Sequence, residues 1–317
     1  MAFENGSLVT EFILLGITDQ PDLKILLFLV FLGTYMITAL GNLTLIILIV
    51  QNSHLHTPMY FFLFNLSCID LCYSSVITPK MLVNFIQKKN VISYMGCMSQ
   101  LYFFCFFVIS ECYILTSMAY DRYVAICNPL MYNVALSPKV CCYLILASYF
   151  MGLSGAMIYT GCILSLTFCD GNTINHYFCD LLPLMQLSCT STYVNEMALF
   201  IVAGKDIIVP TVIIFSSYGF ILFTILKIRS TESRSKAFST CSSHMLAVCL
   251  FFGSGAFMYL KPTSAVSVDK GKFYSVFYTI VVPMLNPLIY SLRNNDVKVA
   301  LRKTLRRRIL CSETGFQ

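Results

Sequence analysis

The chain has 317 residues, of which 57% are hydrophobic and 11% are charged, with a formal net charge of +6. A soluble globular domain carries about 25% charged residues. The composition therefore excludes an ordinary soluble protein and indicates a membrane protein.

Seven apolar segments, each long enough to cross a bilayer as a helix of about 20 residues, follow one another along the chain. They cover residues 24–50, 58–86, 97–127, 139–166, 197–226, 238–260 and 273–292. Short polar stretches separate them, and none could fold alone. The sequence predicts an all-α membrane protein, with a seven-transmembrane-helix bundle over 24–292 between an extracellular segment, 1–23, and a cytoplasmic tail, 293–317.

The Lys and Arg residues predict the orientation of this bundle. With the N-terminus outside, thirteen of the 21 lie on the inner face, seven on the outer face, and Lys205 lies within a span. Inner loops of membrane proteins are enriched in these residues, so we expect a cytoplasmic C-terminus. The net charge is then an asymmetry across a membrane, and we expect no nucleic-acid partner.

The outer segments give two further expectations. Of the three Asn-x-Ser/Thr sequons, at Asn5, Asn42 and Asn65, only Asn5 lies outside a span, so we expect glycosylation there. The first 23 residues lack the basic region and cleavage site of a signal peptide. We expect the first span to insert uncleaved.

Four of the 15 cysteines differ from the rest, most of which sit in apolar runs. Cys97 begins the third span, whereas Cys169, Cys179 and Cys189 lie in the long outer loop, about 167–196. An oxidising compartment favours disulfides, and four cysteines allow three pairings that the sequence does not resolve. The even spacing of ten residues argues against zinc. A stapled loop over the mouth of a bundle is interpreted as a lid.

Ionisable side chains within spans are costly and point to function. Asp70 and Glu111 lie midway along the second and third spans. They could share a proton or a small cation, or one could simply be protonated and hydrogen-bonded, and the two readings are evenly balanced. Lys205 could extend to the outer surface, whereas the shorter Asp206 could not.

The C-terminal segment "VKVALRKTLRRRIL" repeats apolar residues every four positions with basic residues between them. This pattern predicts a short amphipathic helix on the inner membrane surface, in contact with lipid. Cys311 behind it is a weak candidate for lipidation.

Several motifs occur in a characteristic order: Gly41-Asn42, "LHTPMYFFL" at 55–63, "MAYDRYVAIC" at 118–127, Ser217-Tyr218, "KAFSTCSSH" at 236–244 and "PMLNPLIYSLRN" at 283–294. As a set they make the chain similar to an olfactory receptor, of the tetrapod class of rhodopsin-like G-protein-coupled receptors. The resemblance runs from the first span to the last.

The resemblance implies a Cys97–Cys179 disulfide and a Cys169–Cys189 disulfide within the lid. It also implies that Asp70 and Glu111 form a sodium-type site, which would be the only structural ion and the only cofactor. At the inner end of the bundle it implies a switch, in which Asp121 holds Arg122 at rest. On activation Arg122 would be released toward the G protein and the tyrosines of spans five and seven. The switch residues are Asp121, Arg122, Tyr123, Tyr218, His244 and Tyr290.

The resemblance further implies an odorant cavity between spans three, five, six and seven, below the lid. The residues of span three also share one helical face by spacing alone, which ordinary packing would explain equally well. The predicted lining is Phe104, Cys105, Val108, Ile109, Cys112, Val202, Asp206, Ile207, Phe252, Gly255, Ala256, Tyr259, Val276 and Thr279.

Some residues depart from the family pattern. The chain has no Trp, and Phe252 stands where many rhodopsin-like receptors place an indole and olfactory receptors often place a tyrosine. No acid is evident at the inner end of span six to hold Arg122. Asp206 is the one specific clue to ligand chemistry: it either faces the cavity, favouring a basic or hydroxyl-bearing odorant, or pairs internally.

The function implied is detection of a small volatile odorant and activation of a stimulatory olfactory-type heterotrimeric G protein, which raises cyclic AMP. The plasma membrane of sensory-neuron cilia is the expected location. A transporter would show an internal repeat, and none is found. An enzyme would need a nucleophile with an oriented base, which His244 near Ser242 does not provide. The alternative within receptors is a non-olfactory rhodopsin-like receptor for another small molecule.

Overall fold

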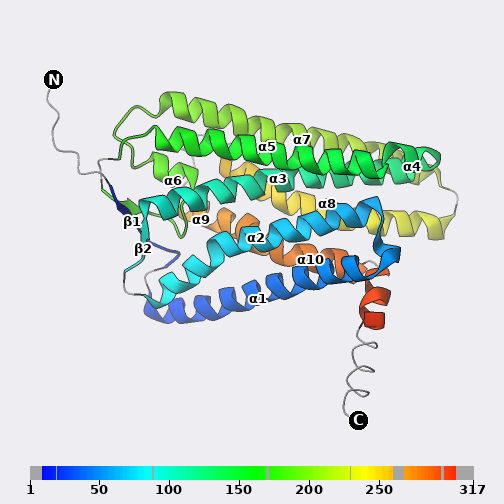
Figure 1. Cartoon of the computed structure of the whole chain (residues 1–317), viewed down its shortest axis with the longest axis horizontal. Coiled ribbons are helices and arrows are strands. Elements are labelled where there is room, and N and C mark those ends of the chain that lie inside the picture. Colours follow the sequence, from blue (N-terminus) through cyan, green and yellow to red (C-terminus); the bar gives the residue numbers. More distant parts are fainter. Residues whose placement is uncertain are drawn as a thin grey trace, which may run out of the picture.

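The computed structural model describes residues 9–18, 20–87, 89–168, 171–228, 230–259, 268–293 and 296–304. Six helical segments are long and apolar enough to cross a membrane: α1 (Pro21–Gln51), α2 (Pro58–Ile86), α3 (Tyr94–Cys127), α5 (Pro138–Leu164), α7 (Tyr193–Lys227) and Gly271–Tyr290. The predicted sixth span is α8 (Thr231–Tyr259), whose apolar part, His244–Tyr259, is shorter because its first turns are polar. The predicted helix bundle is confirmed, and Figure 1 shows its helices running side by side along the long axis.

The last span is not one regular helix. It consists of α9 (Val268–Val276), a π-helical turn at Phe277–Val281 and α10 (Val282–Arg293). A π turn inserts an extra residue per turn and rotates the faces that follow it. Residues 296–304 form a further helix, whereas the rest of the predicted interfacial helix and Cys311 lie outside the described residues.

Pro287 connects the last span to the first. Because proline has no N–H, the carbonyl four residues earlier, that of Pro283, loses its helical partner. Asn42 on α1 supplies the missing donor, with its Nδ2 3.2 Å from that carbonyl oxygen. A Cβ at the adjacent Gly41 would lie 3.0 Å from the Pro287 ring. The Gly41-Asn42 motif thus permits close contact and satisfies the backbone freed by the kink.

Helix α3 lies at the centre of the bundle and packs against α2, α5, α7 and α8. Its approach to α5 depends on two glycines, Gly152 and Gly155. A Cβ at Gly152 would lie 2.6 Å from the Phe106 carbonyl oxygen, closer than atoms can come without a backbone shift. The small residues therefore set the distance between the two helices.

A small sheet, which the sequence did not predict, lies at one end of the bundle beside α6 (Leu181–Met185) (Figure 1). Its central strand, β1 (Glu11–Leu14), pairs antiparallel with β2 (Val91–Ser93) and parallel with β3 (Thr173–Ile174). Phe12 and Leu14 on β1 are fully buried. The N-terminal strand thereby ties the lid, defined as residues 167–192 between α5 and α7, to the loop between α2 and α3.

Two short helical segments lie at the opposite end of the bundle, between α3 and α5. They are η2 (Pro129–Met131) and α4 (Tyr132–Ala135). A single 3-10 turn, η1 (Ser53–Leu55), joins α1 to α2. These connections are short, so the helices they join are neighbours in space.

Candidate functional site

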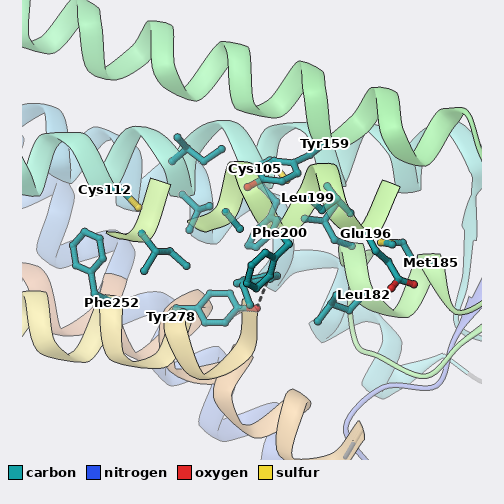
Figure 2. A pocket seen from close by; sticks show the side chains of 18 of the residues that line it. Cys105, Cys112, Tyr159, Leu182, Met185, Glu196, Leu199, Phe200, Phe252 and Tyr278 are labelled. Carbon is teal, nitrogen blue, oxygen red and sulfur yellow. Dashed lines mark hydrogen bonds between the residues drawn. The ribbon is translucent and has the colours of Figure 1, made fainter. Parts of the chain in front are cut away.

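A cavity of about 390 Å³ lies beneath the lid, between α3, α5, α7 and α8. Small-molecule sites in proteins have about 300–1,000 Å³ and mostly apolar walls. Figure 2 shows Phe252 at the inner end of the cavity and Leu182, Met185 and Glu196 at the outer end. The cavity therefore extends from the lid toward the middle of the bundle.

Helix α3 supplies one continuous face of this cavity, as its spacing predicted. Most of the predicted residues line it: Phe104, Cys105, Val108, Ile109, Cys112, Ile207, Phe252, Gly255 and Tyr259. These residues come from three helices that are far apart in sequence. The structure thus brings together the helix faces that were expected to meet.

Five predicted residues do not line the cavity: Val202, Asp206, Ala256, Val276 and Thr279. Two of these differences are one-residue shifts on α7, where Ala203 and Ile207 face the cavity. Val202 and Asp206 lie about 100° away on the helix. Asp206 is instead buried, accepts a 2.9 Å hydrogen bond from Tyr113 and forms a 2.9 Å salt bridge with Lys205. Its internal pairing, the second of the two predicted alternatives, is the one observed.

The last span also differs from the expected arrangement. Tyr278, within the π turn, lines the cavity, whereas Val276, the residue before the turn, and Thr279 do not. Thr279 is fully buried and its hydroxyl lies 2.9 Å from that of Tyr177 in the lid. Ala256 lies beside the α8 face formed by Phe252, Gly255 and Tyr259, but not on the cavity.

Sequence reasoning also missed residues that close the cavity. Leu181, Leu182 and Met185 come from α6 in the lid, and Tyr159 comes from α5. The remaining additions are Tyr193, Glu196, Met197, Leu199, Phe200 and Ala203 on α7, Phe251 on α8 and Tyr278. The four-residue spacing of Leu199, Ala203 and Ile207 was a signal that could have identified the α7 face.

A buried carboxyl group stands behind the cavity wall. Asp180, next to the disulfide, accepts a 2.9 Å hydrogen bond from the Tyr259 hydroxyl and a 2.8 Å hydrogen bond from the Leu181 N–H. The Tyr278 hydroxyl lies 3.2 Å from that of Tyr259. Burial raises the pKa of Asp180 to about 6, against the lowering effect of these hydrogen bonds. Two hydroxyls on the cavity wall are thereby fixed by the lid.

His176 forms a second buried contact of the lid. Its Nε2 lies 3.1 Å from the Ser275 hydroxyl of α9. Burial, followed by the charge of Lys272, lowers the pKa of His176 to about 3. The imidazole is therefore neutral at physiological pH, and the lid is attached to the last span through an uncharged hydrogen bond.

One of the two predicted disulfides, Cys97–Cys179, is present, with Cα atoms 5.5 Å apart. Cys189 is also disulfide-bonded, and its predicted partner Cys169 lies outside the described residues, as does the sequon at Asn5. The first bond fixes the lid to the start of α3, directly above the cavity face of that helix.

Asp70 and Glu111 meet at the centre of the bundle, and both are fully buried. The Asn286 side chain bridges them, with its Nδ2 3.1 Å from Oδ2 of Asp70 and 3.3 Å from Oε1 of Glu111. Glu111 Oε2 and Asn286 Oδ1 are buried without a hydrogen-bond partner in the described part of the chain. The cluster thus contains oxygen atoms with unused acceptor capacity, the type of atom that hard cations bind.

The predicted switch residues gather at the other end of α3. No salt bridge joins Asp121 to Arg122 within the described ranges, although the two charges interact electrostatically. Asp121 instead accepts a 2.8 Å hydrogen bond from Tyr132 of α4. Tyr123 packs against Phe220 on α7.

Arg122 lies among three other predicted switch residues, from three helices. It interacts electrostatically with Tyr218, His244 and Tyr290. The Tyr218 hydroxyl lies 2.7 Å from Nδ1 of the fully buried His244. This contact joins α7 to α8 next to the guanidinium.

Comparisons with known proteins agree with these features. A family model described as olfactory receptor matches residues 31–308. The mouse protein named Olfactory receptor 8B8 is 69% identical, over 97% of this chain and 99% of its own length. The human proteins named Olfactory receptor 8B8 and Olfactory receptor 8B3 are 67% and 68% identical, each over 96% of this chain and over 98% and 97% of their own lengths. The chain belongs to the olfactory receptor family, and it is a multi-pass membrane protein and not an enzyme.

Proposed function

We propose that the chain binds a small volatile odorant in the cavity beneath the lid. The observation that carries this proposal is the cavity itself, whose walls combine apolar side chains with two fixed hydroxyls, those of Tyr259 and Tyr278. Burial of apolar ligand surface contributes about 25 cal/mol per Å², so a small molecule gains moderate affinity there. The hydroxyls supply the few polar contacts that orient it.

Ligand binding would be coupled to a stimulatory olfactory-type heterotrimeric G protein, and through it to a rise in cyclic AMP. Support comes from the Arg122 cluster and from the adjacent loop, where Leu130 is 97% exposed beside the exposed Met131 and Val134. An exposed apolar patch of this kind is typical of a protein-binding surface. We place this end in the cytoplasm and the lid outside, in the plasma membrane of sensory-neuron cilia.

Asp70, Glu111 and Asn286 would hold a sodium ion in the resting receptor. A cation there would neutralise part of the charge of two buried carboxyl groups, which is otherwise costly. The residues that hold it come from α2, α3 and α10, so the ion would stabilise one relative arrangement of these helices. The expected measurement is a rise in melting temperature of the purified receptor with NaCl, relative to choline chloride, that Asp70→Asn abolishes.

The experiment for odorant binding uses two glycines on α8. A Cβ at Gly255 or at Gly253 meets no atom within 4 Å, but only Gly255 lines the cavity. Gly255→Leu should fill the cavity without a clash, whereas Gly253→Leu is the matched control. Both receptors, with equal surface expression, would be tested against a broad panel of volatiles by cyclic AMP.

We expect the control to keep the wild-type responses and Gly255→Leu to lose or shift them. Arg122→Ala should reach the surface and fail to raise cyclic AMP with any of them. Silence of the wild-type receptor across the panel, or an unchanged response of Gly255→Leu, would contradict the proposal.

A further inference from the structure

The odorant cavity is not the only hollow at the lid. A second, outer groove of about 510 Å³ lies between the lid and the start of α7. Four residues line both hollows: Leu182, Met185, Tyr193 and Glu196. In Figure 2, Leu182, Met185 and Glu196 lie together at the outer end of the cavity. The groove and the cavity are thus adjoining chambers. The four side chains that they share are called the ring below.

The two chambers differ in chemistry. Around the groove stand hydroxyl groups of Ser188, Thr190, Ser191 and Thr192, whereas the cavity walls are largely apolar. A ligand that passes from groove to cavity therefore leaves its hydration shell at the shared ring. A charge on the ligand is most costly at that step, unless the ring offers an opposite charge.

Glu196 is the charged member of the ring. Among the described residues that line either chamber, no other carries a formal charge. Its side chain is half-buried, and the Thr192 hydroxyl donates a 2.7 Å hydrogen bond to Oε1. This bond aims the carboxylate at a fixed place. The carboxyl group of Asp180 behind the cavity wall adds negative potential to the same region when it is ionised.

The described lysines of this end do not neutralise that potential at the ring. Lys80 donates to the Val91 carbonyl oxygen at 2.7 Å, and Lys205 pairs with Asp206. Lys24, Lys89 and Lys272 line neither chamber. Among the described residues, Glu196 is therefore the one charged group on the ring itself.

The alternative to an electrostatic role at the ring is a purely structural role for Glu196. An acidic residue in the first turn of a helix interacts favourably with the helix dipole, and the bond from Thr192 resembles a cap. That role requires only a side chain near the helix start. It gives no reason for the carboxylate to line both chambers, and it predicts equal effects on all ligands.

We propose that Glu196 is a specificity-determining residue at the mouth of the odorant cavity, which admits neutral and cationic odorants and rejects carboxylates. This inference rests on the proposed function and adds a ligand class to it: alcohols and amines rather than acids. Direct attraction between a carboxylate and an ammonium near a protein surface is sufficient for about a tenfold preference.

The test uses matched triads of odorants that differ only in the polar group, such as octanol, octylamine and octanoic acid, together with the benzyl triad. Wild type, Glu196→Gln and Glu196→Lys would be compared at equal surface expression by cyclic AMP. Gln keeps the size and the acceptor for Thr192, so it removes the charge alone. The neutral alcohol of each triad reports on structural damage.

We expect the wild type to respond to amines at about tenfold lower concentration than to acids. Glu196→Gln should narrow this gap and Glu196→Lys should reverse it, with the amine and acid responses each expressed relative to the alcohol response of the same receptor. If the alcohols act but the ranking of amine and acid is the same in all three receptors, the specificity role is overturned and the odorant function stands. The triads are tested together with the broad panel of volatiles, and if no compound of the triads or the panel acts on any of the receptors, both proposals fail.

Discussion

The hydroxyl of Tyr132 donates a 2.8 Å hydrogen bond to Oδ1 of Asp121. The bond joins the first residue of α4 to the inner part of α3. Asp121 is thereby bound to the loop and not to its neighbour Arg122. The contact that Asp121 makes is thus with the loop between α3 and α5, which also carries the exposed Leu130.

We predict that Tyr132→Phe weakens signalling. The substitution leaves the buried Asp121 without its donor, which costs about 1–3 kcal/mol, and it frees the loop that presents Leu130. Cyclic AMP at saturating ligand should fall at equal surface expression, and the melting temperature of the purified receptor should drop. Tyr143→Phe, at a side chain that is 70% exposed, is the control. Identical behaviour of the two variants would refute the coupling.

The spans and the α3 face of the cavity could be predicted from the sequence, because hydropathy and helical spacing act locally. The sheet could not be, because the four residues of β1 take their partners from loops about 80 and 160 positions away. The lid residues of the cavity were missed for a similar reason: the place of Leu181 depends on the Cys97–Cys179 bond and on the hydrogen bonds of Asp180. The π turn, in which Tyr278 and not Thr279 lines the cavity, leaves no clear periodic signal in the sequence.

Asp206 lies one position before Ile207, which faces the cavity, and its side chain pairs internally with Tyr113 and Lys205. We predict that Asp206→Ala lowers stability but leaves the ranking of odorants unchanged. The Tyr113 hydroxyl loses its acceptor and Lys205 loses its ion partner, for a cost of about 1–3 kcal/mol, while the cavity wall stays intact. Ile207→Ala, at the next position, should instead shift the concentration–response curves. A changed ranking in Asp206→Ala would mean that the carboxylate reaches the ligand.

The Asp180 carboxyl group should make lid stability depend on pH. Its pKa rises from an unfolded value of 3.8 to about 6 in the folded receptor. Because this pKa is raised, the stability that the protonated Asp180 carboxyl group contributes is fully present below about pH 4. That stability is lost as the pH rises through about 6. Asp180→Asn imitates the protonated form and keeps an acceptor for Tyr259. It should therefore melt at a higher temperature than wild type at pH 7.5, by the equivalent of about 3 kcal/mol.

This difference should vanish near pH 4. His176 acts in the opposite sense, because its lowered pKa removes stability as the pH falls below 6.5. Both receptors share His176, so its contribution cancels when their melting temperatures are subtracted. A difference that is constant from pH 4 to pH 7.5 would show that Asp180 does not titrate in this range.

The contact of α3 with α5 gives the last prediction, Gly152→Ala. The added Cβ would overlap the Ser110 hydroxyl and lie 2.6 Å from the Phe106 carbonyl oxygen. A hydroxyl can rotate away, but a helix carbonyl cannot, so the helices must separate. Overpacking of this kind costs about 1–3 kcal/mol, and separation also moves the cavity face of α3 away from Tyr159. Surface expression, melting temperature and odorant response should therefore fall together.

The matched control is Gly161→Ala on the same helix, where an added Cβ meets no atom within 4 Å. Alanine favours a helix over glycine by about 1 kcal/mol, so this variant should be at least as stable as wild type. The pair separates the loss of glycine as a residue type from the loss of space between helices. Equal melting temperatures for the two variants would show that α3 and α5 do not need the close approach at Gly152, and that the cavity tolerates a wider spacing.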